Sequence, residues 1–274
     1  MTASRAVMMG DMMELNGNPV SPEDLRSLAL CNYGHFTSMR VEEKRVRGLA
    51  RHLERLTRDC RTMFGAELDP DRVRHLARRA AEASEGAVVI RVTVFDPSLD
   101  LGHPADANQP QILVTTRSAS TGDLPPVRLA TTRYDRDIPA VKHIGLLATL
   151  YHRRQGQLGG YDDVLFVNSD SQVYEVATSN IAFVDGDRVV WPAAECLPGV
   201  TMHLIKEVLE KAGISSEDIP ISPDEVSRFR AAFLTNAAVG LRSVVAINAQ
   251  PFAEDISFMS LLRKAYLALP GDPL

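Results

Sequence analysis

The five lysines of this chain lie in different surroundings, and one of them lies where an amine could act as a nucleophile. Lys142 is part of the segment IPAVKHIGLL at 138–147, which is apolar on both sides of the amine. Burial among apolar residues lowers the pKa of an amine and makes it a nucleophile that can form a Schiff base. The alternative is a lysine whose ammonium group reaches water along its own stem. The remaining lysines lie in a charged turn or on amphipathic helices among polar neighbours: Lys44, Lys206, Lys211 and Lys264.

A carboxylate and a run of small residues follow in the next predicted hairpin. Glu175 ends a predicted strand at 172–174 and precedes VATSN at 176–180. A carboxylate at a strand end beside small residues is well placed to meet a bound ligand. The same position also suits an ordinary surface glutamate at the end of a hairpin.

Two further segments have the composition of anion-binding loops. LPGVT at 197–201 leads into a predicted helix at 201–212. The first N–H groups of a helix have no intrahelical acceptor and, together with the Thr201 hydroxyl, they suit a phosphate group. A plain N-cap by Thr201 is the alternative. The second segment, TNAA at 235–238, places small residues after a strand, where the backbone could approach a ligand closely.

An arginine lies at the edge of the apolar stripe of the first long predicted helix. In HLERL at 52–56, Arg55 is about 80–100° from the centre of that stripe on a helical wheel. A guanidinium group at this boundary can reach inward to an anion. It can equally remain solvated on the helix surface.

The arrangement of predicted elements indicates an α+β fold in two domains. We expect an N-terminal α+β domain at 1–118, a linker rich in small residues and proline at 119–126, and a C-terminal α+β domain at 127–274 that carries Lys142. Strands and helices are interleaved but the hairpins are local, which favours α+β over α/β. In the first domain we expect a turn at Asn16-Gly17-Asn18, helices at 46–63 and 70–83, and strands at 34–41, 87–95 and 111–116. In the second we expect helices at 145–157, 201–212 and 256–266, and strands at 127–132, 163–167, 172–174, 181–184, 189–191 and 232–234.

Composition excludes several classes of protein. The net charge of −5 argues against a nucleic-acid surface, which needs a clustered basic face. No apolar run approaches the roughly 20 residues that span a bilayer, and the first 17 residues lack the apolar core of a signal peptide. The three cysteines are odd in number and far apart, without the spacing of a zinc site. We therefore expect a cytoplasmic protein without a structural metal.

Taken in chain order, these short segments resemble the class IV, fold-type IV enzymes that depend on pyridoxal 5'-phosphate (PLP). That group includes branched-chain and D-amino-acid aminotransferases, (R)-selective amine transaminases and aminodeoxychorismate lyases. Seven motifs in one order are more specific than any one of them. They are YGHFTSMR at 33–40, HLERL at 52–56, Lys142, GYDDVLFVN at 160–168, Glu175 to Asn180, LPGVT at 197–201 and TNAA at 235–238.

The resemblance implies a role for each matching residue. Lys142 matches the Schiff-base lysine, which also moves the proton, and Glu175 matches the carboxylate that hydrogen-bonds the pyridine nitrogen. Arg55 matches the phosphate-binding arginine, and Leu197 matches the residue that packs on the ring face. The remaining matches are Val200 and Thr201 in the first phosphate loop, Asn236 and Ala237 in the second, and Phe36, Arg40 and Arg91 near the substrate.

Three departures from the family pattern leave the substrate open. Ala237 replaces the usual hydroxyl residue, Leu147 replaces the Tyr of branched-chain enzymes, and Ala182 replaces an aromatic residue. The resemblance implies an aminotransferase for an amino acid or amine and a keto acid. The alternative is aminodeoxychorismate lyase, which gives 4-aminobenzoate and pyruvate, and to which Lys142-His143 and the 34–41 segment are similar. Related enzymes also imply a homodimer.

Overall fold

The computed structural model describes residues 12–274, which form two compact units. The first unit runs to Ser120 and includes Gly271–Leu274 as well, and the second comprises Thr121–Pro270. Much of the N-terminal segment that is expected to lack a signal peptide lies outside the described residues. Within 12–274, no helix combines the length and apolar character needed to cross a membrane.

The first unit is an antiparallel sheet with helices on one face. Its strand order among the described residues is β16-β4-β3-β5-β6-β1-β2. The strands are β1 (Met13–Leu15), β2 (Asn18–Pro19), β3 (His35–Glu42), β4 (Arg45–Val46), β5 (Val88–Phe95), β6 (Gln111–Ser118) and β16 (Asp272–Pro273). The helices are α1 (Arg26–Cys31), α2 (Leu49–Phe64), α3 (Pro70–Glu82) and the short 3₁₀ turn η1 (Pro104–Asp106).

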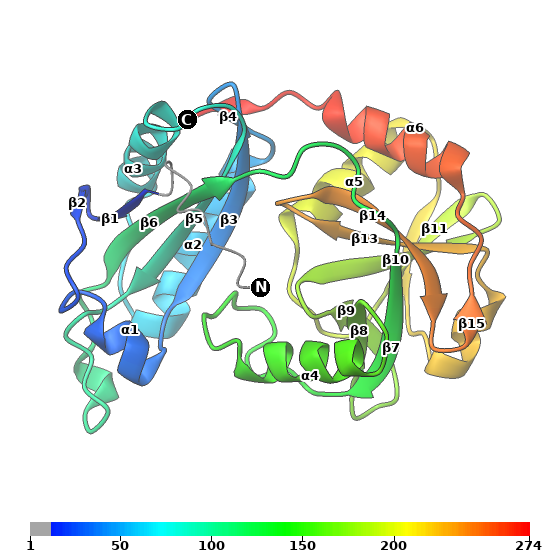
Figure 1. Ribbon diagram of the computed structural model, residues 1–274, viewed down its shortest axis with the longest axis horizontal. Coiled ribbons are helices and arrows are strands. Elements are labelled where there is room, and N and C mark those ends of the chain that lie inside the picture. Colours follow the sequence, from blue (N-terminus) through cyan, green and yellow to red (C-terminus); the bar gives the residue numbers. More distant parts are fainter. Residues whose placement is uncertain (1–11) are drawn as a thin grey trace, which may run out of the picture. The chain divides into compact units, whose positions relative to one another are not determined.

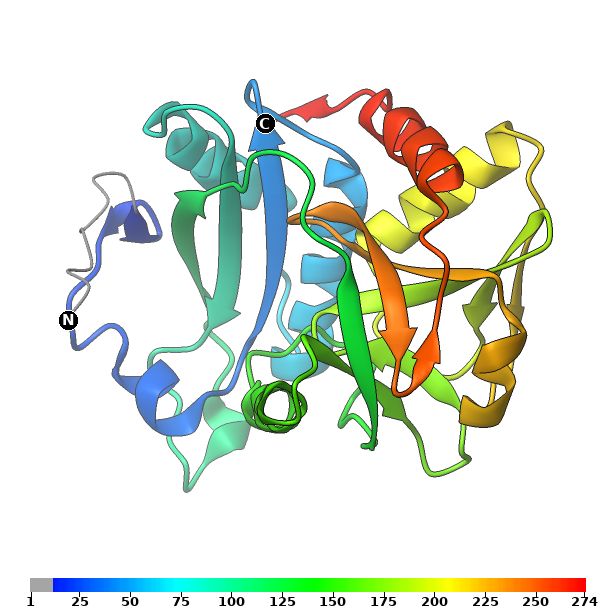
Figure 2. The same cartoon turned by 45° about the vertical axis from the view of Figure 1, so that its right-hand side comes forward.

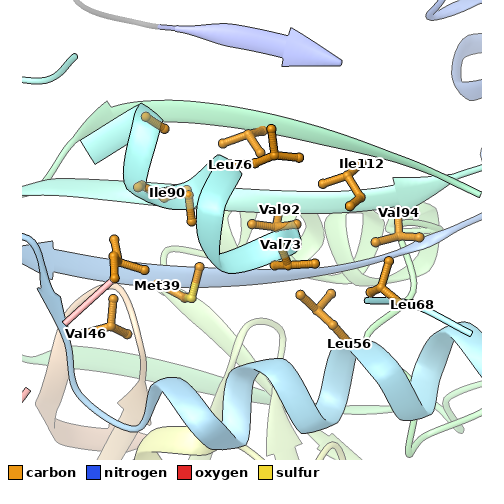
Figure 3. Close-up of a cluster of buried hydrophobic side chains, with 14 of the residues drawn as sticks. Met39, Val46, Leu56, Leu68, Val73, Leu76, Ile90, Val92, Val94 and Ile112 are labelled. Atoms are coloured by element: carbon orange, nitrogen blue, oxygen red, sulfur yellow. The ribbon is translucent and has the colours of Figure 1, made fainter. Parts of the chain in front are cut away.

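Helices α2 and α3 pack against strands β3, β5 and β6 (Figure 1). Apolar side chains at helical spacing, such as Leu56 on α2 and Val73 on α3, meet the side chains of every second strand residue (Figure 3). Asp69 caps α3 by accepting a hydrogen bond from the Asp71 N–H, and Pro70 opens the helix. Gly65 ends α2 in the left-handed conformation. One face of the sheet is thus covered by α2 and α3, and these two helices do not cover the other face.

The second unit is built around a closed barrel. Its strands are β7 (Val127–Arg133), β8 (Asp163–Val167), β9 (Val173–Val176), β10 (Ser179–Asp185), β11 (Arg188–Pro192), β12 (Ser216–Ile219), β13 (Ala231–Asn236), β14 (Gly240–Ile247) and β15 (Gln250–Pro251). Among the described residues the order is β12-β11-β10-β13-β14-β7-β8-β9, and β9 also pairs with β10. This last pairing closes the strands from β10 to β9 into a ring.

Three helices and a 3₁₀ segment accompany the barrel: α4 (Leu147–Leu158), α5 (Val200–Lys211), α6 (Ile256–Leu267) and η2 (Pro223–Arg228). Helices α5 and α6 lie side by side in both views (Figures 1 and 2) and share a core with strands β10, β11 and β13. Side chains from Val127, Leu129, Phe183 and their neighbours fill the barrel interior. The packed barrel therefore gives a rigid support to its connecting segments, among them the segment between β7 and α4 and the loop before α5.

The predicted α+β architecture is confirmed, with local differences. Val46 belongs to β4 rather than to the first long helix, and Glu175 lies inside β9 rather than at a strand end. The sequence analysis assigned 271–274 to the second domain, but β16 pairs with β4 of the first unit. The buried Leu274 side chain joins the core of that first unit, and this burial holds the segment there.

Candidate active site

Lys142 lies in the irregular segment between β7 and α4. It is half-buried, and Val141 and Ile144 on either side of it are buried, as the apolar sequence predicted. Helix α4 begins five residues later. The amine is thus carried on a short segment that is anchored on both sides by buried side chains.

Glu175 is a buried carboxylate with a different donor on each oxygen. Only 4% of the residue is exposed, so it is not the surface glutamate considered above. Its Oε1 accepts a hydrogen bond from Arg136 Nη1 at 3.0 Å, and its Oε2 accepts one from the Leu197 N–H at 3.2 Å. A buried carboxylate requires such partners because its desolvation is otherwise costly.

Arg136 joins Glu175 to the segment that carries the lysine. Its second nitrogen, Nη2, donates to the Val141 carbonyl at 3.1 Å, one residue before Lys142. The guanidinium group therefore spans two elements that are far apart in the sequence. The sequence alone does not single out this arginine, because it lies in the charged run YDRD at 134–137, which is typical of an exposed loop.

Two side chains from the paired strands β9 and β10, Glu175 and Asn180, hold the loop before α5. Glu175 and Asn180 are register partners in these strands. Glu175 accepts from the Leu197 N–H, and Asn180 Nδ2 donates to the Leu197 carbonyl at 2.8 Å. Gly199 has no room for a side chain, because a Cβ there would overlap Asn180 Oδ1. The glycine of LPGVT is thus explained by close packing.

Thr201 lies in the first turn of α5 with its hydroxyl unused. The N-cap residue is Gly199 and no side chain caps the helix, so the alternative of an N-cap by Thr201 is wrong. Thr201 is buried, and within residues 12–274 its Oγ1 has no hydrogen-bond partner. A buried hydroxyl beside free helix N–H groups is unfavourable unless an acceptor joins it. A phosphate oxygen is an acceptor of the right kind, so these residues fit the phosphate group of PLP.

Asn236 shapes the second candidate phosphate loop. Its Oδ1 accepts from the N–H groups of Ala238 and Val239, each at 3.0 Å, and its Nδ2 donates to Ser179 Oγ at 2.9 Å. These bonds hold the chain around Ala237 in a tight turn after β13. The side chain of Asn236 therefore supports the loop.

The first unit contains a separate polar cluster around Arg55. Arg55 is buried and its guanidinium group reaches inward from α2, so the alternative of a solvated arginine on the helix surface is wrong. Its Nη2 donates to Thr37 Oγ1 at 2.6 Å, and the same oxygen lies 2.7 Å from His52 Nδ1. His35 lies on the same strand face as Thr37, where burial and then the charge of Arg55 lower its pKa to about 3. His35 therefore remains neutral beside the cation.

The three residues predicted to lie near the substrate share the opposite face of the same sheet. Arg40 is already engaged, because it binds Glu42 at 2.8 Å and the Ser120 carbonyl at 2.9 Å. Arg91 instead stacks over the Phe36 ring, with Cζ 3.7 Å from the centroid, and its Nε donates to Thr93. Burial lowers the pKa of Arg91, but a guanidinium group stays protonated. Among the described residues, no carboxylate pairs with it.

Comparisons with known proteins give the family. Residues 34–247 match the sequence profile of the family described as amino-transferase class IV. A curated relative, branched-chain amino acid aminotransferase 1 of Humulus lupulus (mitochondrial), is 31% identical over 183 residues, which are 60% of this chain and 45% of the relative. A probable branched-chain-amino-acid aminotransferase of Rickettsia felis is 25% identical over 42% of this chain and 41% of the relative. The matches thus span less than half of these relatives.

Solved structures confirm the fold. A branched-chain aminotransferase from Thermoproteus uzoniensis superposes with a TM-score of 0.84 at 18% identity, covering 93% of this chain and 94% of the other. A putative 4-amino-4-deoxychorismate lyase from Legionella pneumophila gives 0.78 at 23% identity, covering 87% and 93%. An aminotransferase from Brucella abortus bound to PLP gives 0.83 at 19% identity, covering 94% and 98%. With the profile match over most of its length, this chain belongs to the amino-transferase class IV family of PLP-dependent enzymes.

Proposed function

We propose that this protein is a PLP-dependent aminotransferase that binds its cofactor covalently through Lys142. The observation that carries the proposal is the hydrogen-bonded network in the second unit. Arg136 joins the Lys142 segment to Glu175, and Glu175 joins Arg136 to the loop that opens α5. Hydrogen bonds through Arg136 and Glu175 thus connect the segment that carries Lys142 with the loop before α5.

Each of these groups has a chemical task. When bound, PLP supplies an aldehyde and an electron-withdrawing ring. Lys142 would hold PLP through that aldehyde, and its free amine would be the group that moves a proton at the substrate carbon. The Glu175 carboxylate would favour the protonated form of the pyridine nitrogen. The Thr201 hydroxyl and the first N–H groups of α5 would bind the phosphate, and Arg55 is proposed as a phosphate-binding residue because it matches the arginine of the family.

The test of this assignment is chemical labelling. Purified protein should be yellow when loaded with PLP, and borohydride should abolish the absorbance band and leave PLP attached to the peptide that contains Lys142. Lys142→Ala should lose the band and almost all turnover while remaining folded, because a half-buried lysine contributes little to core packing. Label on Lys206 or Lys211 would overturn the site assignment, and the absence of label on any lysine would overturn the enzyme class.

Arg91 is a better candidate than Arg40 for the residue that binds the substrate carboxylate. Arg40 has a carboxylate partner in Glu42, whereas Arg91 has none among the described residues. A half-buried guanidinium with unused donors binds a carboxylate strongly. We expect Arg91→Leu to raise KM for a dicarboxylic substrate about tenfold or more, and Arg40→Leu to have a smaller effect. The reverse order would contradict this choice.

The lyase remains the second candidate. The residue five positions after Lys142 is Leu147, as in the lyase branch and the D-amino-acid branch. An assay of pyruvate release from aminodeoxychorismate, run beside a panel of amino donors and keto acceptors, distinguishes the two activities. Fast pyruvate release without transfer between donor and acceptor would replace transamination by elimination.

We propose further that the protein works as a homodimer. Helix α4 presents exposed apolar side chains along one stripe, namely Leu147, Leu150, Tyr151 and Leu158. Such a stripe suits a self-complementary contact between two copies. Light scattering should give twice the chain mass, and Leu150→Asp should lower it. A fully active wild-type monomer would contradict the proposal.

We also propose a cytoplasmic location. Cys31, Cys60 and Cys196 are free, and burial raises the pKa of the Cys60 thiol to about 11 and of the Cys196 thiol to about 12. These thiols suit a reducing compartment. Cell fractionation tests the assignment directly, and recovery with a secreted or membrane fraction would contradict it.

A further inference from the structure

One residue in front of α5 is held through both of its backbone polar groups by side chains of the barrel. The Leu197 N–H donates to Glu175 Oε2 at 3.2 Å, and the Leu197 carbonyl accepts from Asn180 Nδ2 at 2.8 Å. All three residues are buried. Glu175 and Asn180 lie opposite each other in β9 and β10, so their side chains leave the sheet on the same face. The two side chains therefore bind Leu197 as a neighbouring strand would, through its N–H and its carbonyl together.

The orientation of the Asn180 amide follows from its partners. A carbonyl oxygen only accepts, so the amide group that faces the Leu197 carbonyl must be the NH₂. The same NH₂ lies 3.7 Å from Cys196 Sγ, which is a weak acceptor. The amide oxygen lies against Gly199, where an added Cβ would overlap it. Asn180 thus contacts the loop at two points, one on each side of Pro198.

These two contacts set where helix α5 begins relative to the barrel. Gly199 is the N-cap residue of α5, and Thr201 follows in the first turn. Pro198 has a fixed φ, so the segment from Leu197 to the helix has little freedom of its own. A shift of Leu197 or Gly199 therefore moves the first turn, where the free N–H groups and the Thr201 hydroxyl lie.

We propose that Asn180 is a positioning residue for the phosphate end of the cofactor site: it holds Leu197 and bounds Gly199, and so keeps the first turn of α5 in the position that binds phosphate. The inference rests on the proposed PLP-binding function, and every residue that it uses belongs to the second unit. It goes beyond that function because it assigns a task to a side chain that need not touch the cofactor. Glu175 is also fixed by Arg136, so the loss of Asn180 leaves the carboxylate for the pyridine nitrogen in place.

The experiment compares two ligands that differ by the phosphate alone. Affinities of the apoprotein for PLP and for pyridoxal are measured by equilibrium dialysis, and their ratio gives the phosphate preference. Asn180→Leu keeps a similar shape and removes the NH₂ donor, so the preference should fall about tenfold while the affinity for pyridoxal changes less than about twofold. An unchanged preference would contradict the proposal. An equal loss of affinity for both ligands would also overturn it, because that is the result expected of a role in packing alone.

A second variant tests the contact at Gly199 without changing Asn180. Gly199 has φ −70° and ψ 135°, which alanine adopts without strain, and the nearest atom outside Asn180 is at an ordinary contact distance. Gly199→Ala should therefore act through its overlap with Asn180 and lower the phosphate preference about tenfold. Asn180→Ala removes the overlapping oxygen, so adding Gly199→Ala to it should lower the preference no further. Additive effects would show that the two residues act independently.

Asn168→Leu is the matched control. Asn168 is a half-buried asparagine of the same unit, and its Oδ1 accepts from the Gln172 N–H at 2.8 Å in the turn between β8 and β9. The variant removes a similar bond between a side chain and the backbone, away from the loop before α5. It should leave the phosphate preference at the wild-type value, and a tenfold fall would show that the assay does not isolate the loop.

Failure of this inference can be told apart from failure of the proposed function. If Thr201→Val keeps the wild-type phosphate preference, the assignment of the phosphate to α5 is itself wrong. If Thr201→Val loses the preference while Asn180→Leu and Gly199→Ala keep it, the positioning role alone is wrong.

Amide hydrogen exchange of the apoprotein gives a reading that needs no cofactor. The Leu197 N–H should exchange at least about tenfold faster in Asn180→Leu than in the wild type, because the loop opens more often. The amides of β13 should exchange at the same rate in both proteins. An unchanged rate at Leu197 would show that Asn180 does not hold the loop and would overturn the proposal.

Discussion

The two compact units hold their buried charges by opposite means. In the first, the Arg55 guanidinium donates to a hydroxyl that is itself bonded to an imidazole. In the second, the Glu175 carboxylate receives a guanidinium on one oxygen and a backbone N–H on the other. The first arrangement includes a bond from a cation to a hydroxyl, whereas the second pairs two opposite charges.

The difference corresponds to what each charge is proposed to do. The Arg55 cation is proposed to attract a phosphate, and its bond to the Thr37 hydroxyl adds no opposing charge. A carboxylate that must stay ionised next to a pyridine nitrogen benefits from a fixed cation, because an adjacent positive charge favours the ionised form. The same contrast predicts different responses when one partner is removed.

The largest effect should follow removal of Arg136. Arg136→Leu leaves the buried Glu175 carboxylate without its cation, and breaking such a pair typically costs about 3–5 kcal/mol of unfolding free energy. Trp191, the single tryptophan, is buried in the second unit, so its fluorescence during urea unfolding of the apoprotein reports on this unit. A loss of unfolding free energy no larger than that caused by breaking a surface ion pair would show that the Arg55 cluster and the Glu175 cluster do not differ.

Two further variants sharpen this measurement. Arg188→Leu breaks the solvent-accessible pairs with Asp185 and Glu217 in the same unit and should cost no more than about 1 kcal/mol. Combining Arg136→Leu with Glu175→Leu removes both charges and should recover most of the stability lost by the single variant. A double variant that is as unstable as the single one would point to lost packing as the cause.

The next effect concerns pH and the first unit. Burial, followed by the charge of Arg55, lowers the pKa of His35 from 6.5 to about 3. Between these values the unfolded chain binds a proton at His35 and the folded chain does not, so unfolding becomes easier as the pH falls. From pH 7.5 to pH 5 this should remove about 2 kcal/mol, and His35→Leu should abolish that part of the pH dependence.

Hydrogen exchange of the β3 amides measures this effect inside the first unit. His35→Leu should also be the more stable variant at pH 7.5, because both ring nitrogens of His35 are buried and, within the described residues, have no hydrogen-bond partner. A pH dependence that is the same in both proteins would contradict the neutral state assigned to His35.

Much of the fold follows from local sequence signals. The helical spacing of apolar residues in α2 and the Asp69-Pro70 start of α3 predict both helices, although α2 begins at Leu49 and not at Val46. Strand β14 was missed because the burial of its side chains does not alternate, which removes the period-two signal. Strand β16 was placed in the wrong domain, because its pairing with β4 joins residues more than two hundred positions apart.

The candidate site shows the same limit. Lys142, Glu175 and the loop before α5 could be found from the sequence, since each carries a local feature or a family motif. Arg136 could not, because its importance lies in bonds to Glu175 and Val141 that only the folded chain creates. The contacts of Thr37 Oγ1 with Arg55 and His52 were hidden for the same reason, because both partners lie on another element.

The smallest of the predicted effects is on turnover, from Glu175→Gln. The structure uses both carboxylate oxygens as acceptors, whereas an amide has one acceptor and one donor, so the variant must place an NH₂ group against Arg136 or against the Leu197 N–H. It also removes the charge that would keep the pyridine nitrogen protonated. We expect PLP to remain bound, because the phosphate contacts are unchanged, and kcat to fall at least about tenfold, equivalent to roughly 1.4 kcal/mol.

Glu195→Gln makes the same change of charge at an exposed position of the loop before α5 and should leave kcat near the wild-type value. Turnover should be measured at saturating PLP and well below the melting temperature of each variant, so that a loss of folded protein is not read as a loss of catalysis. Wild-type turnover in Glu175→Gln would mean that the Arg136 pair serves stability alone and that the contrast between the two clusters has no catalytic side.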